Sequence, residues 1–244
     1  MRRSAGPVTA ELYDPDDVTD LPAPVRRYFE TVLQTGHPLA REVRLSQEGD
    51  FRLGDADGSW RPFTASQVYS VSPPGYVWDA RIELFPFASA RVLDAYVDGE
   101  GLLRANLLGA IPVASAGPDA RMNEAELQRY LSETPWFPTA LLPAAGVTWK
   151  GIDDRTARAS VDDGDVTATA TFHFDDDGLI TRLTADRYRQ EDDTVAPWVG
   201  RYGAYEERRG TLIPTEAEVG WITDDGEAPY WRGSITDIEY RTGG

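Results

Sequence analysis

Along most of the chain, apolar and polar residues alternate with a period of two, the pattern of β-strands with one buried face. The alternation is most regular in residues 166–174, VTATATFHF, where apolar side chains alternate with threonine and histidine. Turn sequences such as DGEG at 98–101 and DDDG at 175–178 separate neighbouring segments of this kind, as in antiparallel hairpins. We therefore predict about ten to twelve antiparallel strands.

The period changes to that of a helix in two places. In residues 21–33, Val25, Phe29, Val32 and Leu33 recur at helical spacing after two prolines suited to a first turn. This predicts an amphipathic helix near the start of the chain, which must pack against the sheet.

The second helix is predicted from residue 123. Asn123 and Glu126 have the spacing of a capping box, and Leu127, Tyr130 and Leu131 follow as an apolar stripe. Pro135 should end the helix, because proline removes an amide donor and clashes with the preceding turn. The residues after it, WFPTALLP, predict a stiff, apolar, non-helical plug.

These elements predict a mainly β (α+β) fold. A sheet of this many strands should curl, so we expect one strongly curved antiparallel sheet or incomplete barrel. The N-terminal and central helices should lie on its concave side, and residues 21–244 should form a single domain. Residues 1–20 are polar and acidic and are predicted to be a flexible arm. Barrels of this size enclose either a packed core or a ligand cavity.

The charge composition limits the partners. The formal net charge is −17, which disfavours nucleic acid and anionic membranes as partners. Lys150 is the sole lysine, and an acidic surface nearly free of lysine indicates a halophilic source. No apolar run reaches the ~20 residues that span a bilayer, and none follows the basic start as in a signal peptide. We therefore expect a cytoplasmic protein.

Motifs for catalysis or cofactor binding are not evident. Cysteine is absent, and the two histidines, His37 and His173, are far apart in sequence and form no local cluster of metal ligands. There is no G-x-S-x-G elbow and no glycine-rich phosphate loop. The sequence therefore predicts neither a metal site nor a cofactor, and it points to no catalytic residue.

The central helix carries the best candidate polar groups. Arg129 and Glu133 are four residues apart and share one face. At a cavity rim, the guanidinium could bind the carboxylate or phosphate of a ligand; the alternative is an ordinary helical ion pair. Large aromatic residues could line the same cavity or simply pack the core. The candidate ligand-binding residues are Arg129, Tyr130, Glu133, Trp136, Phe137, Trp78 and Tyr96.

Several motifs together resemble an uncharacterised bacterial and archaeal family of unknown function, of the DUF6544 or DUF6920 type. They are LPAPVRRYF at 21–29, GYVWDARI at 75–82, DAYVDGEG at 94–101, RYLSETPWFPTALL at 129–142 and VTWKGIDD at 147–154. The resemblance covers nearly the whole chain and implies no activity. The order of elements is also similar to the lipoprotein-carrier (LolA-like) half-barrel, which implies a shelter for acyl chains, although a fold does not fix a function.

Three functions are compatible with these features. The first is non-enzymatic binding of a lipid, isoprenoid or acyl chain in a cavity closed by the central helix and the plug. The second is a structural or protein-interaction role with a filled core. The third is an enzyme of unknown class that uses Arg129 and Glu133. We expect the first, and the sequence leaves the oligomeric state open.

Overall fold

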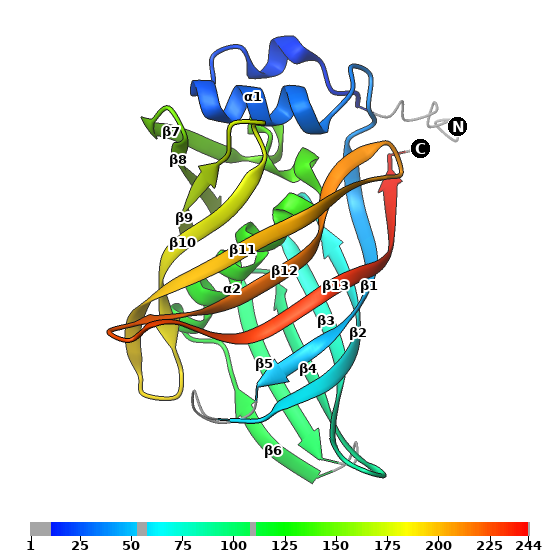
Figure 1. Cartoon of the computed structure of the whole chain (residues 1–244), viewed down its shortest axis with the longest axis vertical. Helices are drawn as coiled ribbons and strands as arrows, with labels where there is room; N and C mark the ends of the chain where they lie inside the picture. Colours follow the sequence, from blue (N-terminus) through cyan, green and yellow to red (C-terminus); the bar gives the residue numbers. More distant parts are fainter. Residues whose placement is uncertain (1–10, 53–57, 108–110, 244) are drawn as a thin grey trace, which may run out of the picture.

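The computed structural model describes residues 11–52, 58–107 and 111–243. Within them, one antiparallel sheet of thirteen strands has the order β6-β5-β4-β3-β2-β1-β13-β12-β11-β10-β9-β8-β7 (Figure 1). The mainly β prediction is confirmed, but the sheet has more strands than the ten to twelve expected.

The strands are β1 (Ala40–Arg52), β2 (Trp60–Ser70), β3 (Gly75–Phe85), β4 (Ala88–Val97), β5 (Glu100–Leu107), β6 (Ile111–Ala116), β7 (Val147–Asp153), β8 (Thr156–Asp163), β9 (Val166–Phe174), β10 (Ile180–Arg189), β11 (Thr194–Arg208), β12 (Thr211–Thr223) and β13 (Gly226–Thr242). The helices are α1 (Ala23–Val32) and α2 (Ala120–Glu133). Short 3-10 turns are η1 (Pro15–Val18), η2 (Thr134–Trp136), η3 (Pro138–Leu141) and η4 (Pro143–Ala145).

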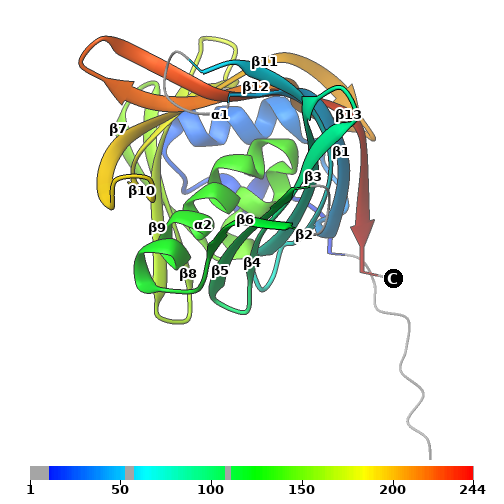
Figure 2. The ribbon, with the colours of Figure 1, turned by 90° about the horizontal axis from the view of Figure 1, so that it is seen from below.

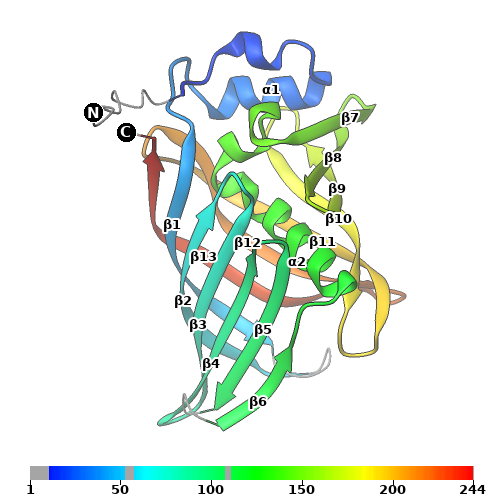
Figure 3. The ribbon, with the colours of Figure 1, turned by 180° about the vertical axis from the view of Figure 1, so that it is seen from behind.

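The sheet consists of two meanders that meet at its centre. Strands β1–β6 and β7–β13 each pair with their neighbours in sequence, and β1 pairs with β13, for example Val43 with Tyr240. The order therefore ends at β6 and β7, and the connection between these strands contains α2. Viewed from below, the strands curve around α2 (Figure 2), whereas α1 lies across one end of the curved sheet (Figures 1 and 3).

Helix α2 bridges the two ends of the curved sheet. It packs against β9 and β10 on one side and against β4 and β5 on the other (Figure 3). Near it, the hydroxyl of Tyr96 on β4 donates a hydrogen bond of 3.0 Å to Asp163 Oδ2 at the end of β8. The helix and this hydrogen bond thus connect strands that are not neighbours in the sheet.

The predicted start of the central helix is wrong. The helix begins at Ala120, and its cap is Asp119, whose carboxylate accepts hydrogen bonds of 2.9 Å from the amides of Arg121 and Met122. Asn123 lies inside the helix, where its Oδ1 accepts a hydrogen bond of 2.8 Å from the amide of Gly101. Because Asp119 is an equally good cap that comes earlier in the chain, the helix gains an extra turn.

The proline-rich plug is part of the core. Trp136, Phe137, Leu141 and Leu142 are each at most 3% exposed and belong to one hydrophobic cluster with α1 and the sheet. This segment was expected to close a cavity as a lid. Instead, side chains fill the space between it and the sheet, because four large apolar groups in a stiff chain find their lowest free energy away from water.

Helix α1 matches the predicted amphipathic helix, with Val25, Phe29 and Val32 buried. Of the predicted arm, residues 1–10 lie outside the described residues. In residues 11–20, Tyr13 is 2% exposed and Val18 is 0% exposed, and the amide of Tyr13 donates a 2.8 Å hydrogen bond to the carbonyl of His37. This part of the segment therefore packs on the domain.

Candidate functional site

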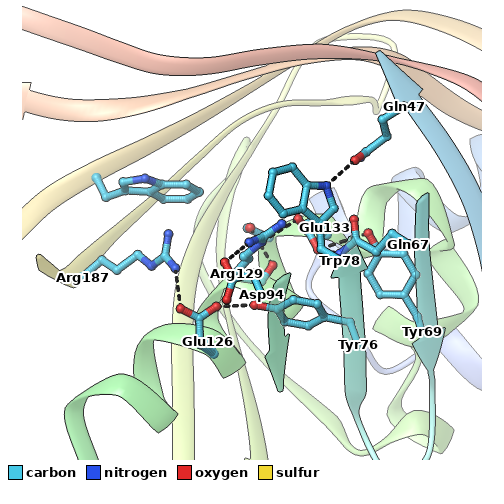
Figure 4. A network of polar contacts seen from close by, with 12 residues as sticks. Gln47, Gln67, Tyr69, Tyr76, Trp78, Asp94, Glu126, Arg129, Glu133 and Arg187 are labelled. Carbon is cyan, nitrogen blue, oxygen red and sulfur yellow. Dashed lines mark hydrogen bonds and ion pairs between the residues drawn. The ribbon is translucent and has the colours of Figure 1, made fainter. Parts of the chain in front are cut away.

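The most unusual feature of the concave side is a buried group of charged residues, Asp94, Glu126, Arg129, Glu133 and Arg187, which we call the charge network (Figure 4). Helix α2 supplies its middle, β4 supplies Asp94 and β10 supplies Arg187. Its side chains are between 5% and 15% exposed. Burial of a charged group costs free energy unless the group is paired, so the partners of each residue in this network decide whether the network is stable.

Arg129 is at the centre of the network. Its Nε donates a 2.9 Å hydrogen bond to Glu133 Oε1, and its Nη1 contacts Asp94 Oδ2. Its guanidinium carbon also lies 5.0 Å from the ring centroids of both Tyr76 and Trp78. The guanidinium is thus held by two carboxylates and two aromatic faces.

Inward-facing residues of β2 hold Glu133 in place. Gln67 Nε2 and the Tyr69 hydroxyl donate hydrogen bonds of 2.7 Å and 3.1 Å to Glu133 Oε2. Residues 67 and 69 alternate to the same face, so one strand delivers both donors. Burial raises the pKa of Tyr69 well above its usual value, which keeps its hydroxyl protonated as a donor.

Glu126 and Arg187 extend the network across the fold. Glu126 accepts a hydrogen bond from the Tyr76 hydroxyl, and its Oε1 lies 3.6 Å from Arg187 Nη2. Arg187 Nη1 in turn donates a 3.5 Å hydrogen bond to the Tyr230 hydroxyl. Through its hydrogen-bond partners on β2 and β13, the charge network therefore connects β2, α2, β10 and β13.

Asp94 is the member with the most perturbed ionisation. Burial and the nearby carboxylate of Glu126 raise its pKa to about 7, and the two arginines offset this only in part. Its Oδ1 has no hydrogen-bond partner among the described residues. A buried carboxyl that titrates near neutral pH with a free oxygen is a common feature of functional sites.

Two buried glutamines beside the network also have unpartnered atoms within the described part of the chain, Gln67 Oε1 and Gln47 Nε2. Their amide orientations follow from their partners. Gln67 must turn its nitrogen to the carboxylate of Glu133, and Gln47 must turn its oxygen to the indole N–H of Trp78, at 2.9 Å. The atoms without a partner among the described residues are therefore an acceptor, Gln67 Oε1, and a donor, Gln47 Nε2.

A group of aromatic residues adjoins the network at Arg187. We call Phe51, Trp198, Trp221 and Tyr230 the aromatic set. The Tyr230 ring lies 6.1 Å from that of Phe51 and 6.0 Å from that of Trp221, and its hydroxyl accepts a 2.9 Å hydrogen bond from Trp198 Nε1. Phe51, Trp221 and Tyr230 are only partly buried, so solvent reaches this apolar surface.

The structure brings together three of the predicted ligand-binding residues, Arg129, Glu133 and Trp78. The predicted helical ion pair is present, but it is buried rather than at a rim. Tyr130, Trp136 and Phe137 belong to the packed core, with the Phe137 ring 4.4 Å from that of Tyr69. Tyr96 is 0% exposed and makes the hydrogen bond to Asp163.

Two hollows lie away from these residues. One of about 800 Å³ is on β1–β4, where its lining includes the outward-facing Glu48, Arg81 and Arg91. Another of about 330 Å³ is lined by residues such as His37 and Tyr240. None of the predicted ligand-binding residues lines either hollow. In the described ranges, no three His, Asp or Glu side chains are grouped to hold a metal ion, and no helix has the length and apolar character to cross a membrane.

Comparison of this chain with the models of known protein families identifies its family. The model of a family of unknown function, DUF6920, matches residues 19–240. The chain belongs to this family. Of the two families that the sequence motifs suggested, DUF6920 is the one supported. Among curated proteins, none matches this DUF6920 chain.

Three solved structures resemble this DUF6920 member at low identity. A LolA superfamily protein from Nitrosomonas europaea aligns over 89% of this chain and 92% of its own, with 10% identity and a TM-score of 0.40. A porin-like protein from Bacteroides uniformis aligns over 83% and 96%, with 12% identity and a TM-score of 0.29. A beta-barrel-like protein of DUF1849 from Brucella abortus aligns over 83% and 99%, with 10% identity and a TM-score of 0.24. These likenesses carry no functional conclusion.

Sequence reasoning about this DUF6920 member missed Asp94, Glu126 and Arg187. The sequence does contain one pointer to them. Asp94 alternates with Val92 and Tyr96, and Arg187 lies two residues from Ala185, so both charges occupy positions of the apolar face. A charge in a core position requires a buried partner, but the strand pattern does not say which residue that partner is.

Proposed function

We propose that the protein binds, without converting it, an amphipathic molecule with a hydrocarbon chain, such as a lipid, an isoprenoid or an acyl chain. The site is the concave surface formed by the charge network and the aromatic set. The polar end of the ligand would lie against the network, and its chain would lie along Phe51, Trp221 and Tyr230. The observation that carries the proposal is that a buried network, with hydrogen-bonding atoms that lack a partner in the described part of the chain, adjoins partly exposed aromatic side chains.

The apolar part of such a ligand would supply most of the affinity. Each methylene removed from water contributes about 0.8 kcal/mol, which corresponds to roughly a fourfold change in Kd. The partly buried rings of the aromatic set offer this surface without displacement of the packed core. The core around Trp136 and Phe137 has no such exposure, so the ligand would not enter beneath the proline-rich segment.

Isothermal titration calorimetry with 1-octanol, 1-nonanol and 1-decanol tests the chain-binding part without a charged head group. We expect one site per protein and an affinity that rises by about two- to fourfold for each added methylene. Absence of saturable binding for all three alcohols, together with absence of a bound species in native mass spectrometry, would contradict the proposal.

A pair of tryptophan variants locates the site. Trp221 pairs directly with the buried Trp198 on the concave face, and Arg189 lies 5.4 Å from its ring centroid. Trp60 has similar arginine contacts, at 4.5 Å from both Arg52 and Arg232, but its position on β2 faces the outer side, opposite to Phe63. We expect Trp221→Ala to weaken decanol binding by roughly tenfold and Trp60→Ala to leave it unchanged.

A second candidate function, acid–base catalysis, is favoured by one observation. Asp94 has a pKa raised to about 7 by burial, which suits a group that gives and takes a proton near neutral pH. Mass analysis of the ligand after incubation separates the two functions. A binding protein returns the ligand unchanged, whereas an enzyme yields a product that is lost in Asp94→Asn.

A further inference from the structure

The turn between β3 and β4 places a large aromatic residue where backbone sterics favour glycine. Phe85 pairs with Ala88, so the turn itself consists of Pro86 and Phe87. Phe87 has a φ of +71°, the sign that the third position of a type II turn requires, and proline is common at the second position. A bulky side chain at positive φ costs free energy, and glycine or asparagine would lower that cost.

Burial does not offset this cost. Phe87 is 105% exposed, and Phe85 beside it is 67% exposed. Ile111, at the start of β6, is 55% exposed at the same end of the sheet, because its partner Leu107 pairs in turn with Ala90 (Figure 3). We call Phe85, Phe87 and Ile111 the apolar tip. A residue that breaks a local rule without a gain in packing points to a function outside the fold.

The apolar tip lies at one extremity of the molecule. Figure 1 has the longest axis vertical, and the β3–β4 turn is at its lower end, opposite α1. A phenylalanine side chain offers about 150–250 Å², so the apolar tip stays below the roughly 800 Å² that each partner buries in a stable protein–protein interface. A small protruding tip suits a soft surface that closes around it, and the interface of a lipid bilayer is such a surface.

The charge around the apolar tip differs from that of the whole chain. In residues 81–93 the charged residues are Arg81, Glu83 and Arg91, so two positive charges and one negative charge give +1, against −17 for the chain. Arg61 also lies at the tip, with its guanidinium carbon 5.4 Å from the ring centroid of Phe85. Repulsion by lipid phosphate groups is therefore weaker at this end than the net charge of the chain implies.

We propose that the protein docks on the surface of a lipid bilayer through the apolar tip, with Phe85 and Phe87 inserted among the lipid head groups. This inference goes beyond the proposed function and does not depend on it. Docking in this orientation brings the Phe51 end of the aromatic set towards the bilayer, because Phe51 pairs with Arg61, whose guanidinium lies over the Phe85 ring.

Co-sedimentation with sucrose-loaded vesicles of phosphatidylcholine in 1 M KCl tests the docking. At this ionic strength the Debye length is about 3 Å, so repulsion by the acidic surface is screened. We expect the natural protein to sediment with the vesicles, and Phe87→Asn to have a partition coefficient lower by roughly tenfold, because one exposed ring is lost. Absence of vesicle binding by the natural protein, or equal binding of the two proteins, overturns the inference.

The same variant separates docking from folding. Asparagine tolerates positive φ better than phenylalanine, so Phe87→Asn should keep or raise the melting temperature while it weakens vesicle binding. A lowered melting temperature would mean that the ring supports the fold, and it overturns the inference. Ile152→Asn is the control, since Ile152 is 53% exposed on β7, beside α1 at the opposite end (Figure 1). It should bind vesicles as the natural protein does, and a loss equal to that of Phe87→Asn overturns the inference.

Two further measurements identify other uses of the apolar tip. Phe87→Asn should bind decanol as tightly as the natural protein, and Trp221→Ala should keep its vesicle binding. Loss of vesicle binding in Trp221→Ala but not in Phe87→Asn would mean that lipids enter the ligand site, and it overturns docking by the tip. Sedimentation velocity without vesicles should show no effect of Phe87→Asn. A dimer of the natural protein that this variant disrupts would make the tip a contact between two copies, and it also overturns the inference.

Discussion

Arg129 and Glu133, one helical turn apart on α2, are joined by a 2.9 Å hydrogen bond, and their side chains are only 15% and 11% exposed. An ion pair at this spacing is common on the surface of a helix, where it is worth a few tenths of a kcal/mol. Here the same pair faces the inside of the curved sheet. The chain contains a matched exposed pair, Arg26 and Glu30 on α1, at 3.7 Å and 42% and 53% exposed.

This difference in burial predicts different effects of the same substitution. Arg129→Met should lower the free energy of unfolding by about 3–5 kcal/mol, because it leaves the carboxylates of Asp94 and Glu133 buried without their partner. Arg26→Met should change it by less than about 0.5 kcal/mol. Urea unfolding of both variants measures the contrast, and similar losses in the two would show that the network contributes no more than a surface pair.

The raised pKa of Asp94 predicts a specific dependence of stability on pH. A folded-state pKa of about 7, against the ordinary value of 3.8 for an aspartic acid, means that between these pH values the folded protein holds a proton that the unfolded chain has lost. The stability from this group is present below pH 4 and is lost as the pH rises to 7. Between pH 5 and 8, the stability of the natural protein relative to Asp94→Asn should therefore fall by about 2–3 kcal/mol.

Chemical denaturation of both proteins at pH 5, 6, 7 and 8 checks this slope. Groups far from the charge network titrate equally in the two proteins, so the difference reports Asp94 together with the charged groups around it. A difference that stays constant, or that rises with pH, would show that the folded-state pKa of Asp94 is not raised.

The close approach of α2 to β5 predicts that a side chain at Gly101 lowers the stability of the fold. A Cβ on Gly101 would lie 2.9 Å from both the carbonyl oxygen of Met122 and the Cγ of Glu126. Gly101→Ala should displace the helix that carries the network and cost about 1–3 kcal/mol of stability. Gly117, where a Cβ would meet nothing within 4 Å, is the control, and Gly117→Ala should be within about 0.5 kcal/mol of the natural protein.

Thermal unfolding followed by circular dichroism gives the comparison for the two glycine variants. Equal melting temperatures for Gly101→Ala and Gly117→Ala would mean that α2 tolerates displacement from β5. A selective loss in Gly101→Ala should be accompanied by weaker decanol binding, since Glu126 moves with the helix.

The acidic composition predicts stabilisation by salt. With a net charge of −17 and a single lysine, the folded chain carries strong self-repulsion at low ionic strength. Salt at 1 M shortens the Debye length to about 3 Å and should screen most of it. We expect the free energy of unfolding to rise by more than about 2 kcal/mol between 0.05 and 1 M KCl. A flat or falling curve would contradict a halophilic adaptation.

The sequence by itself determined the regular elements, because strand and helix periodicities are local properties of neighbouring residues. The alternation in 166–174 predicted β9, and the apolar stripe through Val25 and Phe29 predicted α1. The spacing of Arg129 and Glu133 likewise predicted their ion pair. The cap of α2 was misplaced because Asn123 and Asp119 are both good capping residues, and local rules do not choose between them.

The tertiary structure alone decided the composition of the site. Asp94, Arg129 and Arg187 are far apart in sequence, and only the pairing of β1 with β13 and the placement of α2 inside the curve bring them together. It also decided that Trp136 and Phe137 pack the core while Trp221 and Tyr230 remain partly exposed. All four are large aromatic residues with the same local preference for burial. Which of them leaves water completely depends on the rest of the fold, because burial is a property of the surroundings and not of the residue.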